Sequence, residues 1–282
     1  MSRISRALGP VEALLGATGR FAGDPASRMV AWLRHASGVW HLFILTLKFS
    51  FIVPLGGRSK LRKQLFPMMS NVGVRSFPIV ALISVLMGAI LVLQTGDVME
   101  TFGQIREVPG LVAISMTREL GPLMTAVIMT GRVGASFTAV LASMKINDEV
   151  MALETMAINP VGYLVAPRFL SMLIMVPCLT VIAYLVGMIG GGIVAFAAYD
   201  ITSAVYIMKS TFYLDMADVY SGLIKAVVFA VLITMVCCYY GLITEGGPVG
   251  LGRNTMVAVV TSLVMVVIAD ALLTAFMVSY VY

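Results

Sequence analysis

The sequence contains few charged residues and few of the side chains that carry most enzyme chemistry. Only 12% of its 282 residues are charged and 60% are hydrophobic, whereas a soluble domain is about half apolar and a quarter charged. It has two histidines, His35 and His41, and no His-Glu-x-x-His, Gly-x-Ser-x-Gly or Walker A pattern. We therefore expect no catalytic residue, no metal site and no bound cofactor in this chain, and no ATP hydrolysis by it.

Cysteine is also scarce. Cys178, Cys237 and Cys238 all lie in apolar runs, and an odd number of cysteines in such positions argues against a disulfide framework. A free cysteine behaves as a small buried hydrophobe. We interpret all three as packing residues.

Long apolar segments dominate the rest of the chain. A membrane-spanning helix needs about 20 largely apolar residues, and five segments qualify, at roughly 69–95, 110–142, 169–198, 219–243 and 255–281. The second is long enough to be tilted or broken, and Gly121-Pro122 is the expected place for a break. The sequence predicts an all-α integral membrane protein.

The N-terminal part differs from these spans. Residues 1–25 lack a long apolar core, so we expect a flexible cytoplasmic tail rather than a cleaved signal peptide or an organellar transit peptide. Residues 26–66 mix Trp32 and Trp40 with basic residues, which is typical of a helix lying in the membrane interface. Pro54-Leu55-Gly56-Gly57 would end this helix, and a basic connector would follow at 58–63. A sixth span is the alternative, and the membrane domain proper would cover 67–282.

The basic residues favour one orientation. The net charge is +5, and the basic residues lie mainly in the N-terminal quarter of the chain. This distribution favours contact with an anionic cytoplasmic leaflet over binding of nucleic acid. With the N-terminus in the cytoplasm, the C-terminus lies outside and the inner side receives Arg58, Lys60, Arg62, Lys63, Lys145, Arg168 and Arg253. The outer side receives Arg106 and Lys209 with Asp97, Glu100, Glu107, Asp200, Asp215 and Asp218.

A short acidic helix is expected at 147–158, between the second and third spans. Asn147 can cap it, its first turn holds Asp148 and Glu149, and Asn159-Pro160 stops it. An apolar stripe is formed by Val150, Leu153, Ala157 and Ile158. A surface helix resting on the bilayer is one interpretation. Acidic residues next to anionic headgroups favour the other, which is docking into a groove of a partner protein.

Charged residues inside the spans are costly and are functional candidates. Arg118 and Glu119 lie about nine residues inside the second span; they either form internal ion pairs with Arg132, Lys225 or Asp270, or line a cavity for an amphiphile with a charged head. Arg132, Lys225 and Asp270 are expected to be structural, with Lys225 and Asp270 as a candidate pair. Glycines at 187 and 190–192 predict close helix packing, and Gly246 to Arg253 predict a tight turn.

These motifs resemble the MlaE/YrbE family of permeases over roughly residues 60–280. The resemblance rests on Arg118-Glu119-Leu120-Gly121-Pro122, Gly131-Arg132-Val133-Gly134-Ala135-Ser136, Asp148-Glu149 to Asn159-Pro160, Ala166-Pro167-Arg168-Phe169, Gly187 to Gly192, Lys225-Ala226-Val227-Val228-Phe229 and Gly246-Gly247-Pro248-Val249-Gly250-Leu251-Gly252. It implies an interfacial helix plus five spans, the same architecture that hydropathy predicts. It also implies a homodimeric membrane subunit of an ABC transporter for phospholipids or related lipids.

The resemblance further implies partners and residue roles. Two ABC ATPase subunits would hold ATP and magnesium, an MCE-domain protein, usually a ring of six, would lie on the outer side, and some systems add a STAS-domain protein. Glu119, with Arg118 and Leu120, would lie near the lipid cavity. The short helix would be the coupling helix, contacting the ATPase through Asp148, Glu149, Met151, Leu153, Glu154 and Met156. We expect a bacterial inner-membrane protein that supports outer-membrane lipid asymmetry.

Two other functions remain open from the residues. One is a secondary transporter or channel acting alone, with Arg118, Glu119 and Asp270 as an ion relay, although no internal repeat supports it. The other is an intramembrane enzyme, for which the sequence contains no recognisable nucleophile, base or metal set.

Overall fold

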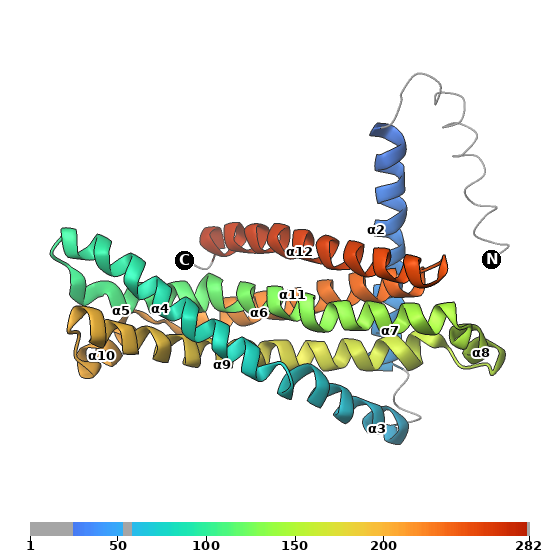
Figure 1. Ribbon diagram of the computed structural model, residues 1–282, viewed down its shortest axis with the longest axis horizontal. Coiled ribbons are helices and arrows are strands. Elements are labelled where there is room, and N and C mark those ends of the chain that lie inside the picture. The colour runs from blue at the N-terminus through green and yellow to red at the C-terminus, as the bar shows by residue number, and fades with distance from the viewer. Residues whose placement is uncertain (1–24, 53–57, 281–282) are drawn as a thin grey trace. The chain divides into compact units, whose positions relative to one another are not determined.

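The structure is a computed structural model that describes residues 25–52 and 58–280, and every regular element in these ranges is a helix (Figure 1). The chain divides into two compact units, one ending at Ile44 and one beginning at Leu45. The first unit holds most of α2 (Pro25–Leu47), the predicted N-terminal helix. Its placement in the membrane interface stays a prediction. The predicted tail at 1–25, apart from Pro25, and the helix end at Pro54–Gly57 lie outside the described residues.

The second unit contains five helical stretches long and apolar enough to cross a membrane, which confirms the predicted number of spans in the described part of the chain. Their bounds are Gln64–Thr101, Ile105–Ile146, Val161–Tyr199, Met216–Leu242 and Gly247–Ser279. The first span joins α3 (Arg58–Met69), η3 (Ser70–Val74) and α4 (Phe77–Thr101). The predicted basic connector at 58–63 therefore belongs to the first turns of a helix.

The second span is not broken at Gly121-Pro122. It runs through η4 (Ile105–Glu107), α5 (Val108–Ser115), η5 (Met116–Leu120), α6 (Gly121–Met129), η6 (Thr130–Gly134) and α7 (Ala135–Ile146). The segments η5 and η6 are π-helical turns, in which backbone hydrogen bonds join residues five apart rather than four apart. The wide turn η5 ends directly before Gly121, so the chain accommodates Pro122 without interrupting the helix.

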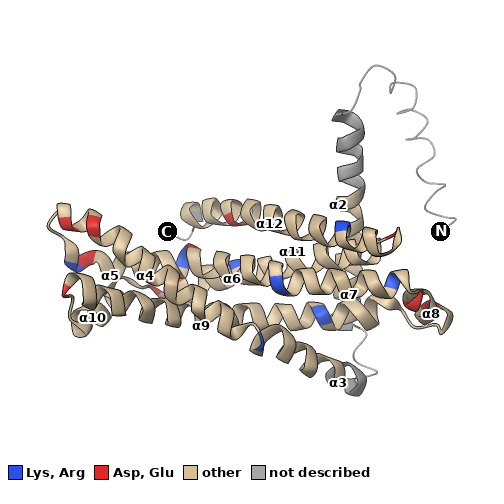
Figure 2. Cartoon of the chain, in the orientation of Figure 1, with Lys and Arg blue, Asp and Glu red and all other residues tan. Residues whose placement is uncertain are grey.

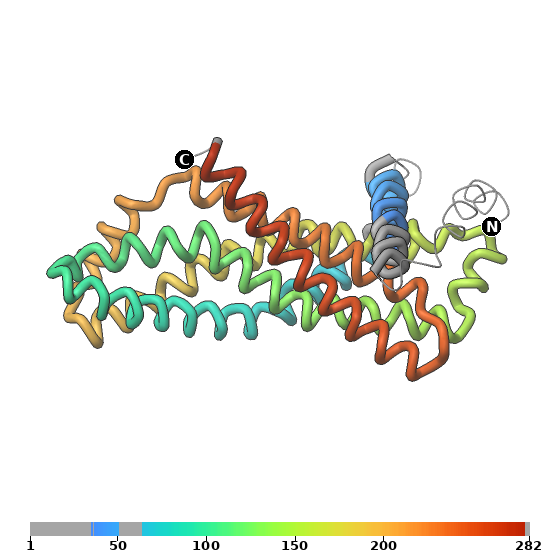
Figure 3. The backbone as a smooth tube through the Cα atoms, turned by 90° about the horizontal axis from the view of Figure 1, so that it is seen from above, coloured from blue at the N-terminus to red at the C-terminus, as the bar shows by residue number. Residues whose placement is uncertain are grey.

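The last two spans are α11 (Met216–Leu242) and α12 (Gly247–Tyr280). In the most apolar window of each, 67% of the α11 residues are buried but only 17% of the α12 residues, so α11 is central. Figure 3 shows α12 running obliquely across α7 and α11, its two main neighbours. A large apolar face of α12 is thereby left for lipid or another subunit.

Small residues allow the third span to approach its neighbours closely. This span joins η7 (Val161–Val165) to α9 (Ala166–Tyr199), and α9 packs extensively on α4. A side chain at Gly88 of α4 would collide with the backbone of Gly187 in α9, and one at Gly190 would collide with Val85. The predicted glycine packing face is therefore present.

Several local predictions were wrong. The short helix α8 covers only Glu149–Thr155, and Asn147 does not cap it, because Asn147 ends α7 and the cap position is Asp148 in a left-handed backbone conformation (φ 58°). The glycine-rich segment is a turn only as far as Gly246, because Gly247-Pro248 already starts α12, and proline is favourable in a first helical turn. Cys237 and Cys238 are buried as predicted, whereas Cys178 is exposed.

The structure also contains a helix that the sequence analysis does not predict, α10 (Ser203–Tyr213), between the third and fourth spans. It packs on α5. Figure 2 shows acidic residues gathered where α4 ends and α5 begins, near α10, and charges of both signs at the opposite end, around α8.

Candidate functional site

A small pocket with charged residues in its lining lies between the second span, α11 and α12. Its volume is about 210 Å³, and its lining residues are Ile114, Ser115, Arg118, Glu119, Ser221, Lys225, Thr274, Met277 and Val278. It therefore contains two of the charged residues that the sequence singled out in the second span. The following contacts show how those charges are held.

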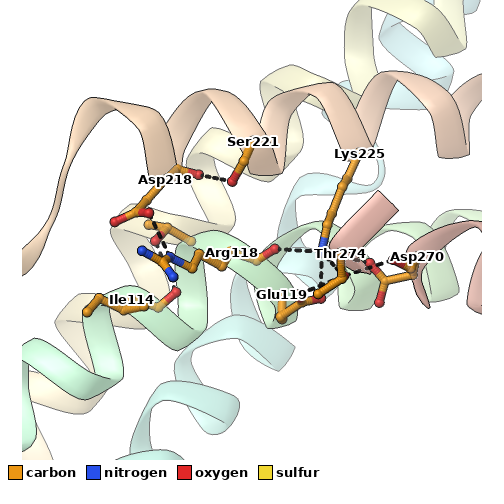
Figure 4. Close-up of polar contacts among 9 residues, drawn as sticks. Ile114, Arg118, Glu119, Asp218, Ser221, Lys225, Asp270 and Thr274 are labelled. Atoms are coloured by element: carbon orange, nitrogen blue, oxygen red, sulfur yellow. Dashed lines mark hydrogen bonds and ion pairs between the residues drawn. The ribbon is translucent and has the colours of Figure 1, made fainter. Parts of the chain in front are cut away.

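Lys225 is the centre of the cluster. Its side chain is 2% exposed, and its ammonium lies 2.7 Å from Glu119 Oε2 and 3.0 Å from Asp270 Oδ1 (Figure 4). It also donates a hydrogen bond of 2.7 Å to the hydroxyl of Thr274. That hydroxyl lies 2.8 Å from both Glu119 Oε1 and the Asp270 carbonyl, and its single proton can serve one of them at a time. The expected pairing of Lys225 with Asp270 is present, and Glu119 shares the same cation.

The proline of the second span contributes to this arrangement. In an α-helix the carbonyl of Arg118 would accept a hydrogen bond from the residue four positions later, which is Pro122 and has no N–H. The ammonium of Lys225 lies 3.1 Å from that carbonyl oxygen and donates to it. The backbone beside Gly121-Pro122 thus supplies an acceptor for the buried lysine.

Arg118 is held by a second carboxylate, that of Asp218. The distance from Arg118 Nε to Asp218 Oδ1 is 2.6 Å, and the Asp218 side chain is 1% exposed. The sequence analysis assigned Asp218 to the outer side and did not predict that it is buried. Asp215 and Asp218 form a capping box at the start of α11, and this Asp-x-x-Asp spacing could have indicated that Asp218 belongs to a helix.

The charges of the cluster do not cancel. Two cations, Arg118 and Lys225, accompany three carboxylates, those of Glu119, Asp218 and Asp270, which leaves one excess negative charge when all are ionised. Lys225 and Asp218 are almost fully buried, whereas the side chains of Arg118 and Glu119 are 35% and 36% exposed. The pocket therefore presents one positive and one negative group side by side, each positioned by a buried counter-ion.

Two predicted residues lie apart from this pocket. Leu120 packs against a buried apolar cluster that includes Val92, Met116 and Tyr206, and it is not among the pocket-lining residues. Arg132, in η6, donates a hydrogen bond to the Ser76 hydroxyl, directly before α4. Arg132 thus joins the second span to the first, and its purely structural role stays a prediction.

The α8 helix presents an exposed surface of acidic residues and methionines. Asp148, Glu149 and Glu154 are exposed, as are Met151 (56%) and Met156 (68%). The predicted apolar stripe does not form the exposed surface of this helix. Val150 is buried and Leu153 is half-buried. Any partner of α8 would thus meet the methionines and the acidic side chains.

A further ion pair links α10 to the start of the second span. Lys209 Nζ lies 2.5 Å from Glu107 Oε1 and 5.8 Å from the centre of the Tyr213 ring. The hydrogen bond from Lys209 to Glu107 raises the pKa of the Lys209 ammonium, and a hydrogen bond to the same carboxylate raises the pKa of Tyr213. These contacts attach α10 to the end of the bundle opposite α8.

The fold and the site define a polytopic α-helical membrane protein with a charged pocket among its spans. The family description Permease MlaE matches residues 65–276. A relative from Rickettsia typhi, described as a probable ABC transporter permease protein, is 36% identical over 237 residues, which are 84% of this chain and 90% of the relative. A relative of the same description from Synechocystis is 32% identical over 241 residues, 84% and 91% of the two chains.

A plant protein is similar as well. The protein TRIGALACTOSYLDIACYLGLYCEROL 1, chloroplastic, from Arabidopsis thaliana is 31% identical over 208 residues, 74% of this chain and 59% of the relative. The chain belongs to the MlaE permease family. It is therefore a transmembrane permease subunit rather than a catalyst, as the resemblance implied.

Proposed function

We propose that this chain is the membrane subunit of an ABC transporter that moves phospholipids or related lipids between the inner membrane of a bacterium and an external MCE-protein conduit. In this role it contributes to outer-membrane lipid asymmetry. Two ATPase subunits hold ATP and magnesium, and in some systems a STAS-domain protein binds them.

The observation that carries this proposal is the paired exposure of Arg118 and Glu119 in the pocket among the spans. A zwitterionic headgroup has a phosphate for the guanidinium and a cation for the carboxylate, and the buried counter-ions Asp218 and Lys225 hold both groups in place. Charged groups inside a membrane are retained where they serve such a function. The lipid class also has support from the name of the Arabidopsis relative, which is that of a glycerolipid.

The size of the pocket supports a homodimer. A volume of about 210 Å³ is below the roughly 300–1,000 Å³ of sites that enclose a drug-sized ligand, so it suits a headgroup and not two acyl chains. Each buried CH₂ contributes about 0.8 kcal/mol, so the tails need a continuous apolar path. A second copy facing this pocket would supply that path.

The energy source must come from a partner, since this chain contains no nucleotide-binding pattern. The exposed acidic and methionine surface of α8 is the surface we assign to the ATPase. Closure of two ATPases around ATP would move the two α8 helices, and the connected spans would change the cavity between the permeases. The N-terminus and α8 then lie in the cytoplasm, and the C-terminus and α10 lie in the periplasm near the MCE protein.

Substitution of Glu119 tests the site. Glu119→Gln keeps the shape of the side chain and removes its charge, so we expect ATP-dependent lipid transfer by the reconstituted complex to fall about tenfold, as for loss of one charge-assisted contact. Glu100→Gln, at an exposed site near the end of α4, is the matched control. Equal transfer by the two variants would remove Glu119 from the lipid site.

Purification from the native membrane tests the assembly. A mild-detergent pull-down of the tagged chain should recover an ABC ATPase, an MCE-domain protein and enriched phospholipid. Recovery of the chain alone, together with transport activity in liposomes without ATPase, would instead support a stand-alone secondary transporter.

A further inference from the structure

A second pocket lies at the α8 end of the described bundle, separate from the Arg118–Glu119 site. Its volume is about 540 Å³, and it is lined by Gln64, Pro67, Met68, Asn71, Met144, Tyr163, Leu164, Pro167 and Arg168. These residues come from the first turns of the first and third spans and from the last turns of the second. The pocket therefore lies where these spans begin and end.

Arg168 is the unusual residue of this pocket. It is 6% exposed, and its Nη1 donates a hydrogen bond of 2.5 Å to the Leu164 carbonyl. Its guanidinium lies 5.7 Å from the centre of the Phe137 ring. Its Nε is buried without a hydrogen-bond partner, and no carboxylate among the described residues forms an ion pair with it.

Such a state is costly for a folded protein. A buried cation needs a counter-ion, and a buried N–H without an acceptor loses its hydration without replacement. By contrast, Arg118, Lys209 and Lys225 each have a carboxylate within 3.0 Å. Arg168 is thus arranged to receive an anion that the described chain does not supply.

Other groups around the pocket favour the same ligand. The carboxamide oxygen of Asn71 accepts a hydrogen bond of 3.3 Å from Arg75, which leaves the N–H groups of Asn71 as donors. Gln64 adds a second amide at the rim.

The remaining lining is apolar and points to a lipid as the source of the anion. Pro67, Met68, Met144, Leu164 and Pro167 surround the polar groups, and flexible methionine surfaces suit acyl chains. A free phosphate would leave most of this space unfilled. A lipid would place its phosphate on Arg168 and the upper part of its chains against the methionines.

We propose that this pocket binds the phosphate of an anionic membrane lipid, with Arg168 as its buried counter-ion. The lipid joins the first span to the third beside α8, and it is a bound component of the fold rather than transported cargo. The site does not depend on the transport function proposed above.

The test uses the full-length purified chain and measures its thermal midpoint in detergent with three probes. These are a short-chain phosphatidylglycerol, a short-chain phosphatidylcholine and inorganic phosphate. We expect phosphatidylglycerol to raise the midpoint of the wild type and of Arg253→Gln, which removes an exposed arginine elsewhere. Arg168→Gln should weaken phosphatidylglycerol binding roughly tenfold or more, the effect of one charge-assisted contact, and Arg168→Lys should restore part of it.

Asn71→Phe is a second test that keeps Arg168 in place, in case the Arg168 variants misfold. Asn71 is exposed at the rim, and the larger side chain fills the pocket without removing the buried charge. Loss of the phosphatidylglycerol response in this variant, with a folded helical spectrum, would support the proposal. An equal response to inorganic phosphate would overturn the lipid assignment in favour of a soluble anion. An unchanged response in both Arg168→Gln and Asn71→Phe would overturn the site.

Discussion

Removal of Lys225 should be the most damaging single change in the ion-paired cluster. In Lys225→Met, the carboxylates of Glu119 and Asp270 lose the ammonium that lies 2.7 Å and 3.0 Å away, and the carbonyl of Arg118 loses its donor. Breaking a buried ion pair by removing one partner costs about 3–5 kcal/mol. Glu119 is 36% exposed and keeps part of its hydration, so we expect the lower end, about 3 kcal/mol.

The magnitude can be checked by circular dichroism of the helical signal during thermal unfolding in detergent. For a chain of this size, about 3 kcal/mol corresponds to a fall in Tm of roughly 6–12 °C. Arg253→Met is the control, because it removes an exposed cation. The double variant Lys225→Met/Asp270→Leu should recover part of the loss, because an apolar pair can replace a buried ion pair at little cost.

Two results would refute this reasoning. A Tm for Lys225→Met within about 2 °C of the wild type would show that the ion pairs contribute nothing net to stability. If the double variant loses as much stability as the two single variants together, or more, then Lys225 and Asp270 do not share one stabilising interaction.

Three further outcomes are expected. Gly222→Ala should lower stability by about 1–3 kcal/mol, because the new methyl group meets the Thr117 carbonyl and the Tyr184 hydroxyl. Gly252→Ala, with open space around it, should be neutral or stabilising. Equal melting temperatures of the two variants would contradict this. Met156→Asp, directly after α8, should abolish co-purification of the ATPase. Met208→Asp, the same change at an exposed site on α10, should not. Recovery of the ATPase with both variants would remove Met156 from the docking surface. Because the pKa of Lys209 is raised in the folded chain, its contribution is present below its unfolded pKa of about 10.4 and is lost as the pH rises through the folded value. The Tm difference between the wild type and Lys209→Met should therefore stay constant up to about pH 10 and shrink above it, and a difference that does not shrink there would exclude this ion pair as the cause.

The sequence alone predicted the features that depend on composition along one segment. Five apolar runs of sufficient length predict five spans, because a backbone in lipid must satisfy its hydrogen bonds within each helix. The unusual positions of Arg118 and Glu119 were equally visible, since a charge in an apolar run stands out without any knowledge of its neighbours. The pairing of Lys225 with Asp270 could be suggested only because few other charges lie in the spans.

Other features depend on contacts between segments far apart in the chain. Asp218 was assigned to the outer side without a partner, yet it is buried and paired with Arg118, 100 residues earlier in the chain. The helix α10 has a mixed composition and is stabilised by its packing on α5 and by the ion pair between Lys209 and Glu107. Arg168 was counted as an ordinary charge on the cytoplasmic side.

Sequence therefore determined the number of spans, the family and most of the charged residues of the site, because hydropathy and motifs are local properties. Tertiary structure decided which charges meet. Lys225 is shared by two carboxylates and the Arg118 carbonyl, and Arg168 is left with an unpaired buried N–H. The physical reason is that the energy of a buried charge depends on the few ångströms around it, and only the packing of the helices sets those distances.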